Sequence, residues 1–131
     1  MRSIVFDELL DSEVEAVRGY LNERASVSGV EDLYWIKLDR ELWNEGQITA
    51  LSGHDGELAD GCRIAVELGD DWVRFELLVR AEGVLNIGGG PADERQSLFV
   101  LRWANEMAAR LGLPSCAGHP RECQRKETGN D

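Results

Sequence analysis

The fold is decided by residues 63–80, which have the sequence RIAVELGDDWVRFELLVR. Apolar and polar residues alternate in residues 63–68 and again in residues 72–80, with Gly69-Asp70-Asp71 between the two runs. Alternation with a period of two places one set of side chains on each face of a strand, and glycine with aspartate is typical of a tight turn. The stretch therefore predicts an antiparallel hairpin with one apolar face. Leu78 breaks the alternation on the other, polar face.

Two further segments are expected to extend this sheet. In residues 33–38, Tyr34, Ile36 and Leu38 alternate with Trp35 and Lys37, as expected for a half-buried strand. Residues 84–87 are short enough for an edge strand, and the breaker that follows contains three glycines and a proline, residues 88–91.

Apolar stripes at helical spacing lie near both ends of the chain. The first stripe consists of Phe6, Leu10, Val14, Val17 and Leu21. Its helix starts either at a capping box over residues 12–15 or at an N-cap on Asp7, and it ends at residues 26–29.

The second stripe consists of Val100, Trp103, Ala104, Met107, Ala108 and Leu111. Its helix is delimited on both sides, because Asp93 and Gln96 have the spacing of a capping box and Gly112 can take the left-handed conformation after the last turn. Pro114 prevents the helix from continuing.

These elements predict an α+β fold of two layers. We expect an antiparallel meander of three to four strands, with the N-terminal and the C-terminal helix packed on its one apolar face. Residues 1–114 would form this single domain, and residues 115–131, which are polar, would form a flexible C-terminal tail.

Composition limits the classes of function. The chain has 131 residues, of which 43% are hydrophobic and 30% charged, and its net charge is -11. Such a negative chain repels phosphate backbones and anionic lipid surfaces, so we expect neither nucleic-acid nor membrane binding. The chain shows no signal-peptide pattern and no apolar stretch of membrane-spanning length, and its three cysteines are an odd number, which favours free thiols and a cytoplasmic protein.

Cysteine and histidine residues near the C-terminus give one candidate for chemistry. Cys116, His119 and Cys123 supply the soft ligands that zinc prefers, and a fourth ligand would come from Cys62 or from His54. The spacing is not that of the common paired zinc knuckles, so the alternative is that these residues carry unligated thiols with Cys62 partly in the core. We therefore expect no cofactor, with zinc as the alternative.

Two other clusters are weaker candidates. His54 is followed by acidic residues in the glycine-rich stretch 39–61, which suggests either a hydrolase using His54 or, more simply, solvated loop charge. The glycines of residues 88–90 precede a helix, but Asp93 and Glu94 already occupy its positive end and would repel a phosphate. We assign no catalytic residue.

The outer face of the predicted sheet gives the last candidate, a surface for protein contacts. It would contain Trp35, Lys37, Trp72, Arg74, Leu78 and Arg80. Large aromatic residues framed by arginine are typical of protein interfaces. The alternative is that residues 39–61, with Leu42, Trp43 and Ile48, cover both tryptophans.

The sequence therefore indicates a small intracellular binding or accessory protein that contacts a protein partner, or a second copy of itself, through this face. In composition and element types a small acidic α+β chain of this size resembles the secretion-chaperone class, and the resemblance supplies no site residues. A small zinc-binding protein is the alternative function.

Overall fold

The computed structural model describes residues 2–52, 61–81 and 90–113. Three helices, one short 3-10 helix and six strands follow one another along the chain. Their order is β1 (Ser3–Phe6), α1 (Asp11–Arg24), β2 (Ser26–Val27), β3 (Leu33–Lys37), the 3-10 helix η1 (Arg40–Leu42), α2 (Glu45–Ser52), β4 (Cys62–Leu68), β5 (Val73–Ala81), β6 (Gly90–Pro91) and α3 (Glu94–Leu111).

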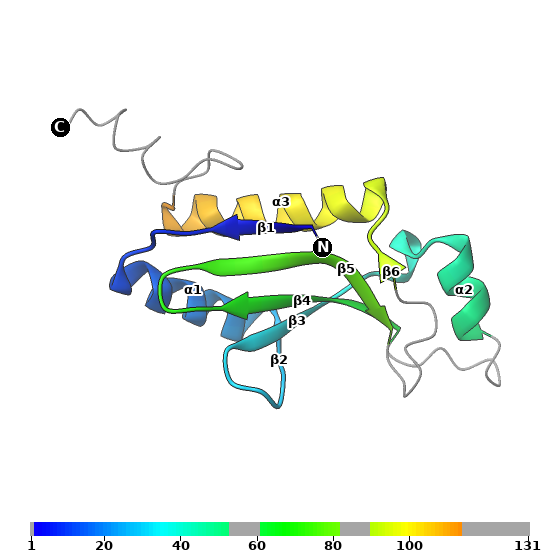
Figure 1. Ribbon diagram of the computed structural model, residues 1–131, viewed down its shortest axis with the longest axis horizontal. Coiled ribbons are helices and arrows are strands. Elements are labelled where there is room, and N and C mark those ends of the chain that lie inside the picture. The colour runs from blue at the N-terminus through cyan, green and yellow to red at the C-terminus, as the bar shows by residue number, and fades with distance from the viewer. Residues whose placement is uncertain (1, 53–60, 82–89, 114–131) are drawn as a thin grey trace.

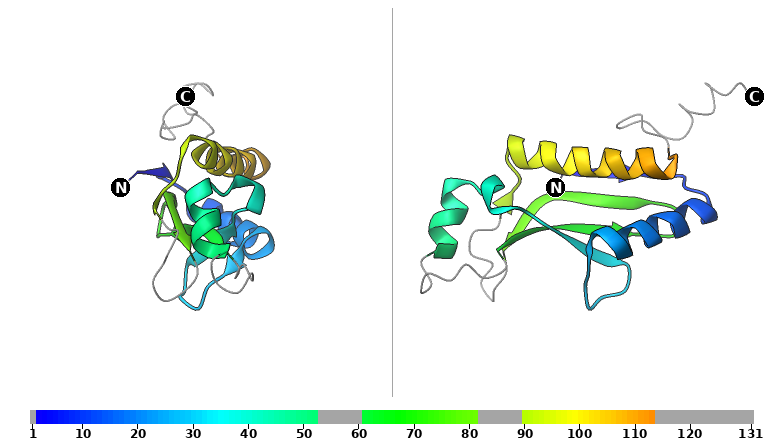
Figure 2. Two further views of the ribbon diagram at one scale, coloured as in Figure 1. Left: turned by 90° about the vertical axis from the view of Figure 1, so that its right-hand side faces the viewer. Right: turned by 180° about the vertical axis from the view of Figure 1, so that it is seen from behind.

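The strands form one antiparallel sheet in the order β1-β5-β4-β3-β2, and β6 pairs with β5 beyond β1. Helices α1 and α3 lie on one face of this sheet, and the opposite face carries no helix of the described chain (Figures 1 and 2). The predicted two-layer α+β fold is thus confirmed. The sheet has six strands rather than three or four, because β1, β2 and β6 join the predicted meander.

The N-terminal residues Ser3–Phe6 form a strand, and the prediction that Phe6 belongs to the apolar stripe of the first helix is wrong. Phe6 lies opposite Val73 of β5, and its ring meets the Phe75 ring edge-on at 6.3 Å. Helix α1 then begins after Leu10, whose backbone N–H donates to the Glu13 carboxylate at 2.8 Å. Neither of the two predicted starts is used, because the chain first completes β1.

The predicted end of α1 also changes. The helix ends at Arg24, and residues 26–27 form β2 at the edge of the sheet, opposite Trp35 and Tyr34 of β3. A short turn then leads into β3, and Arg18 of α1 forms an ion pair with Asp32 in this turn. The contact fixes the β2–β3 turn to the helix layer.

Residues 39–52 are more ordered than the sequence suggests. They contain η1 followed by α2, a helix that the sequence analysis missed. Asn44 and Gln47 cap the start of α2 reciprocally, with N–H to side-chain oxygen distances of 2.9 and 2.8 Å. Helix α2 lies beyond one end of the sheet (Figure 1).

The β4–β5 hairpin is confirmed, and it contains a bulge. Ile64 lies opposite Val79, whereas Val66 lies opposite Phe75, so one residue of β4 faces three residues of β5. On the opposite edge of β5, β1 pairs only as far as Glu76, and β6 continues along that edge with Pro91 opposite Leu78. The predicted breaker therefore ends as a short strand at Gly90–Pro91, while residues 84–87 lie outside the described part.

Helix α3 has the predicted boundaries. Asp93 accepts the Gln96 backbone N–H at 2.8 Å, and Gly112 closes the helix in the left-handed conformation with φ 72°. Its buried stripe packs on the inner face of the sheet, where Trp103 contacts both Phe75 and Tyr20 edge-on or tilted.

The described residues include no helix with the length and apolar character needed to cross a membrane. The predicted tail of residues 115–131 lies outside the described part, so the division at residue 114 stays a prediction.

Candidate binding surface

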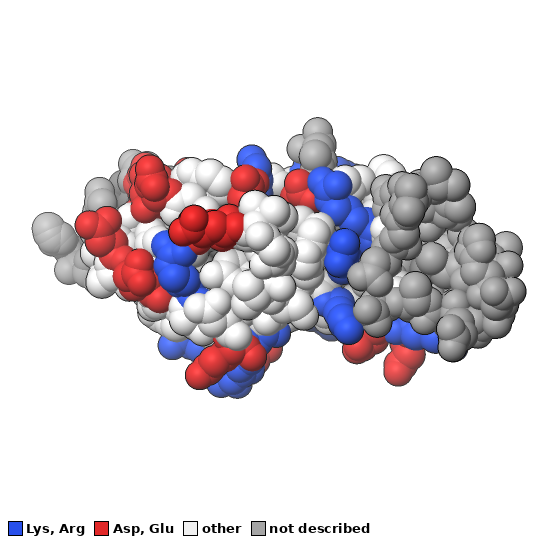
Figure 3. Space-filling view, turned by 90° about the horizontal axis from the view of Figure 1, so that it is seen from below, with Lys and Arg blue, Asp and Glu red and all other residues white. Residues whose placement is uncertain are grey.

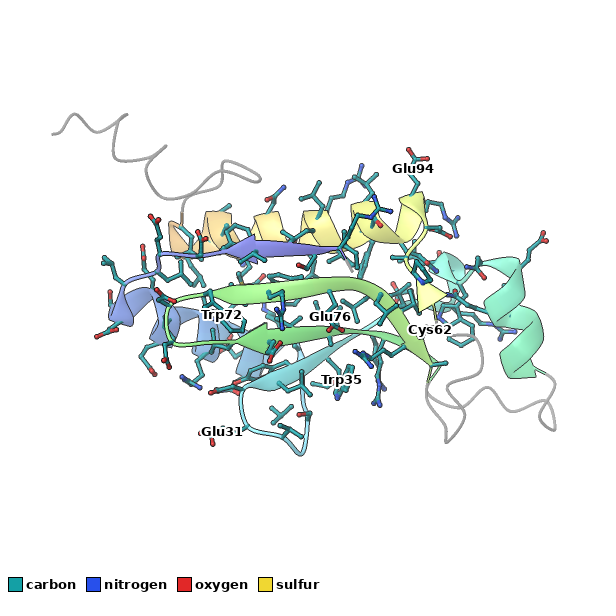
Figure 4. All side chains as sticks on the ribbon, viewed as in Figure 1. Glu31, Trp35, Cys62, Trp72, Glu76 and Glu94 are labelled. Atoms are coloured by element: carbon teal, nitrogen blue, oxygen red, sulfur yellow. The ribbon has the colours of Figure 1, made fainter. Side chains whose placement is uncertain are left out.

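We define the outer sheet face as the side of the sheet opposite α1 and α3. In an antiparallel pair, residues directly opposite each other point to the same face. The register places Trp35, Lys37, Arg74 and Arg80 on this face, and alternation along β5 adds Leu78. Trp72 directly precedes β5, and its ring lies against the Arg74 guanidinium. Figure 4 shows Trp35 and Trp72 at separate places along this face.

Trp72 and Arg74 form the first aromatic–cation pair of the outer sheet face. The Arg74 guanidinium lies 5.2 Å from the centre of the Trp72 ring and is hydrogen-bonded to the Glu67 carboxylate on β4. The indole packs directly on the β4–β5 turn, because a Cβ at Gly69 would lie 2.1 Å from its Cε2 atom. Glycine at this turn therefore permits the position of Trp72.

Trp35 and Arg63 form the second pair. The Arg63 guanidinium lies 4.0 Å from the centre of the Trp35 ring, within the usual range of a cation–π contact. The sequence analysis did not include Arg63 in the surface. Its place in the alternating run of residues 63–68 already put it on the polar side of the hairpin, but its contact with Trp35 depends on the β3–β4 register.

An open pocket of about 450 Å³ adjoins this second pair. Its lining consists of residues 26–29 together with Trp35, Lys37 and Arg63. The pocket thus lies between the β2–β3 turn and the middle strands of the sheet, and its floor combines an indole with two cationic side chains.

Three cationic residues stand in a row across β3, β4 and β5. Lys37 lies opposite Arg63, and Arg63 lies opposite Arg80. Arg80 also pairs with Glu76 at 3.2 Å, and the Glu76 carboxylate is only 13% exposed. We call Lys37, Arg63 and Arg80 the basic row. Seen from below, lysine and arginine side chains gather in a band across the molecule, which is notable in a chain with net charge -11 (Figure 3).

Residues 39–48 do not cover the tryptophans of the outer sheet face. Trp43 is buried in the core, where its indole N–H donates to the Leu38 carbonyl at 3.0 Å, and Leu42 and Ile48 also pack against the core. Trp35 and Trp72 are both half-buried. The alternative of a covering segment therefore finds no support in this part of the stretch, and residues 53–60 lie outside the described part.

Of the predicted zinc ligands, the structure places only Cys62. Its side chain is fully buried on the inner face of β4, and burial raises the pKa of its thiol to about 11. A thiolate is the form that binds zinc, so this environment is unfavourable for a ligand. Cys116, His119, Cys123 and His54 lie outside the described residues, among which no group of acidic, cysteine or histidine side chains could hold a metal ion.

Comparison with known proteins gives one partial similarity. No family model matches the chain, and no solved structure matches it. A phosphate acyltransferase from Rhodopseudomonas palustris (strain BisB18) is 38% identical over 77 residues, which cover 55% of this chain and 21% of the acyltransferase. The chain thus spans about a fifth of the length of that relative, and the similarity does not assign the activity of that protein to this chain.

Proposed function

We propose that this chain is a small cytoplasmic binding protein that holds a protein partner, or a second copy of itself, on the outer sheet face. The observation that carries the proposal is that two half-buried tryptophans, each beneath an arginine, lie on a sheet face that no described helix covers. The proposal includes neither nucleic acid nor a membrane as a partner, and it assigns no catalytic residue.

The chemistry of the two pairs supports a protein-binding role. Tryptophan and arginine are enriched among the residues that dominate the energy of protein interfaces. Tryptophan buries a large area with few rotatable bonds, and arginine makes several hydrogen bonds. The cation–π contacts hold both side chains in place before a partner arrives, which reduces the entropy lost on binding.

The two pairs also differ in their surroundings. Arg74 already donates to Glu67, so the Trp72 pair presents mainly an apolar ring edge to a partner. The Trp35 pair borders an open pocket. A partner that contacts both pairs would therefore meet an apolar anchor at one end of the face and a charged recess at the other.

The test compares two apolar positions on opposite layers of the fold. Trp72→Ser removes the apolar anchor of the outer sheet face, whereas Leu98→Ser removes an exposed apolar side chain, 43% accessible, from α3. We expect the tagged wild-type protein and Leu98→Ser to retain the same partner, or the same dimer mass in solution, and Trp72→Ser to lose it. Equal retention by all three folded proteins would overturn the proposal.

A further inference from the structure

We propose that residues 39–52 form a latch that opens as one unit while the sheet stays folded, and that Gln96 of α3 holds this latch closed. The latch covers the start of β4, so its opening exposes the buried Cys62 thiol and one end of the core. The inference concerns the end of the sheet next to α2, and it does not depend on the proposed role of the outer sheet face.

The latch lies outside the sheet. Helix α2 stands beyond one end of the strands, next to the start of α3 (Figures 1 and 2). Among the strand pairs of the described chain, none includes a residue of the latch. Opening of the latch therefore leaves these pairs intact, whereas global unfolding must break them all.

Local hydrogen bonds give the latch a shape of its own. The Trp43 backbone N–H donates to the Arg40 carbonyl at 3.0 Å. Asn44 and Gln47 cap the start of α2 reciprocally. Because both partners of each bond belong to the latch, these bonds are kept when the latch moves as a unit.

Two neighbouring residues of α3 bind the latch. Gln96 donates to the Leu42 carbonyl and to the Gln47 side chain, and Arg95 donates to the Glu41 carbonyl at 2.9 Å. Gln96 and Gln47 are both buried, so a polar junction lies inside the protein at this point. Such a junction separates at a lower cost than an apolar one, because water replaces its hydrogen bonds.

Trp43 is the apolar part of the latch. Its side chain is buried in the core, and its indole N–H donates to the Leu38 carbonyl at 3.0 Å. The ring packs on Gly61, where an added Cβ would lie 2.0 Å from Cζ2. Gly61 directly precedes Cys62, and Figure 4 shows Cys62 at the end of the sheet nearest to α2. Trp43 thus covers the start of β4.

Cys62 reports whether the latch is open. Its side chain is fully buried, and burial raises the pKa of its thiol to about 11. The closed protein therefore offers a thiol reagent almost no thiolate. If the latch opens by itself, Cys62 reacts at a rate set by the latch. If it does not, Cys62 reacts only at the rate that global unfolding allows.

The experiment follows the reaction of Cys62 with methyl methanethiosulfonate, a small thiol reagent, in the full-length protein at neutral pH. Mass spectrometry of the peptide that contains Cys62 keeps Cys116 and Cys123 out of the measurement. We expect a rate far below that of the unfolded protein but about tenfold or more above the rate that global unfolding allows. At low urea the rate should hardly change, because opening of the latch exposes little surface.

Gln96→Met tests the role of the amide that holds the latch. Methionine cannot donate to the Leu42 carbonyl or to Gln47. These bonds exist only in the closed state, so their loss favours opening. We expect Cys62 to react about tenfold faster or more, as expected when a buried carbonyl loses its hydrogen bond.

Phe6→Leu is the matched control. Phe6 packs against Phe75 and lies opposite Val73, at the end of the β4–β5 hairpin away from Cys62. The substitution lowers global stability, but β1 stays paired when the latch opens. The rate at Cys62 should therefore stay within about twofold of the wild-type rate.

The outcomes decide for or against the latch. If Gln96→Met and Phe6→Leu both speed the reaction in proportion to the stability they lose, Cys62 is reached only by global unfolding and the proposal is overturned. Reaction of the wild-type protein at the rate of unfolded protein would show that Trp43 does not cover Cys62. If Gln96→Met does not fold, a wild-type rate that rises with urea as steeply as global unfolding would still overturn the proposal.

Discussion

Substitution of Gln96 by methionine should release residues 40–47 from α3. Gln96 is fully buried, and its side-chain N–H groups donate to the Leu42 carbonyl at 2.9 Å and to the Gln47 side-chain oxygen at 2.8 Å. Its own oxygen accepts the Asp93 backbone N–H at 3.0 Å. This amide thus holds both the 3-10 helix and α2 against the start of α3.

Methionine has nearly the volume of glutamine but cannot make these bonds. Gln47 keeps a partner, because its side-chain oxygen also accepts the Asn44 backbone N–H. The Leu42 carbonyl and the Asp93 N–H each lose the bond that Gln96 supplies. Leaving each of these two buried groups without its hydrogen bond costs about 1–2 kcal/mol, so Gln96→Met should lower the free energy of unfolding by about 2–4 kcal/mol. The melting temperature should fall by about 10 °C.

Urea unfolding followed by circular dichroism measures this change, and hydrogen exchange locates it. We expect the amides of residues 40–47 to exchange faster in Gln96→Met, while those of β4 and β5 change only with global stability. Arg102→Met, an exposed change on the same helix, is the control. A loss below about 0.5 kcal/mol, the usual range for surface substitutions, would refute the role assigned to Gln96.

Three further outcomes follow from the described contacts. Gly61→Ala should destabilise the fold by about 2 kcal/mol or more in urea unfolding, because its Cβ would lie 2.0 Å from Trp43 Cζ2 at a φ of 77°. Cys62 should stay unmodified by iodoacetamide at pH 8 in peptide mapping of the folded protein, because burial raises its pKa to about 11; modification at the rate of unfolded protein would contradict this. A double-mutant cycle of Arg18→Met and Asp32→Asn should give a coupling of about 0.5–1 kcal/mol, and a value near zero would show that the turn is held by backbone contacts alone.

Local signals in the sequence were sufficient for the central hairpin and for α3. The alternation in residues 63–80 sets which side chains face the helices, and Asp93, Gln96 and Gly112 mark both ends of the last helix. These features depend on a few neighbouring residues, and the structure confirms each of them.

Elements that depend on distant partners could not be predicted in the same way. The spacing of Phe6 and Leu10 fits a helical stripe, but pairing of β1 with β5 decides that Phe6 lies in a strand. The α2 helix lacked a clear apolar stripe, although the spacing of Asn44 and Gln47 was a local signal for its start. The sequence alone does not show which strand β1 pairs with.

The candidate surface also combines features that local sequence predicts with features that depend on strand pairing. Strand alternation was enough to place Trp35, Trp72 and Arg74 on one face. The pairing of Arg63 with Trp35 and the basic row require the register between strands, which alternation does not set.

Site-specific photo-crosslinking tests the central claim most directly. With p-benzoylphenylalanine in place of Trp72, on the outer sheet face, irradiation of cells should give a covalent adduct to a protein partner or to a second copy of the chain. With the same group in place of Arg102 on α3, no such adduct should form. Adducts of equal yield at both positions, or adducts at position 102 alone, would contradict a binding role for the outer sheet face.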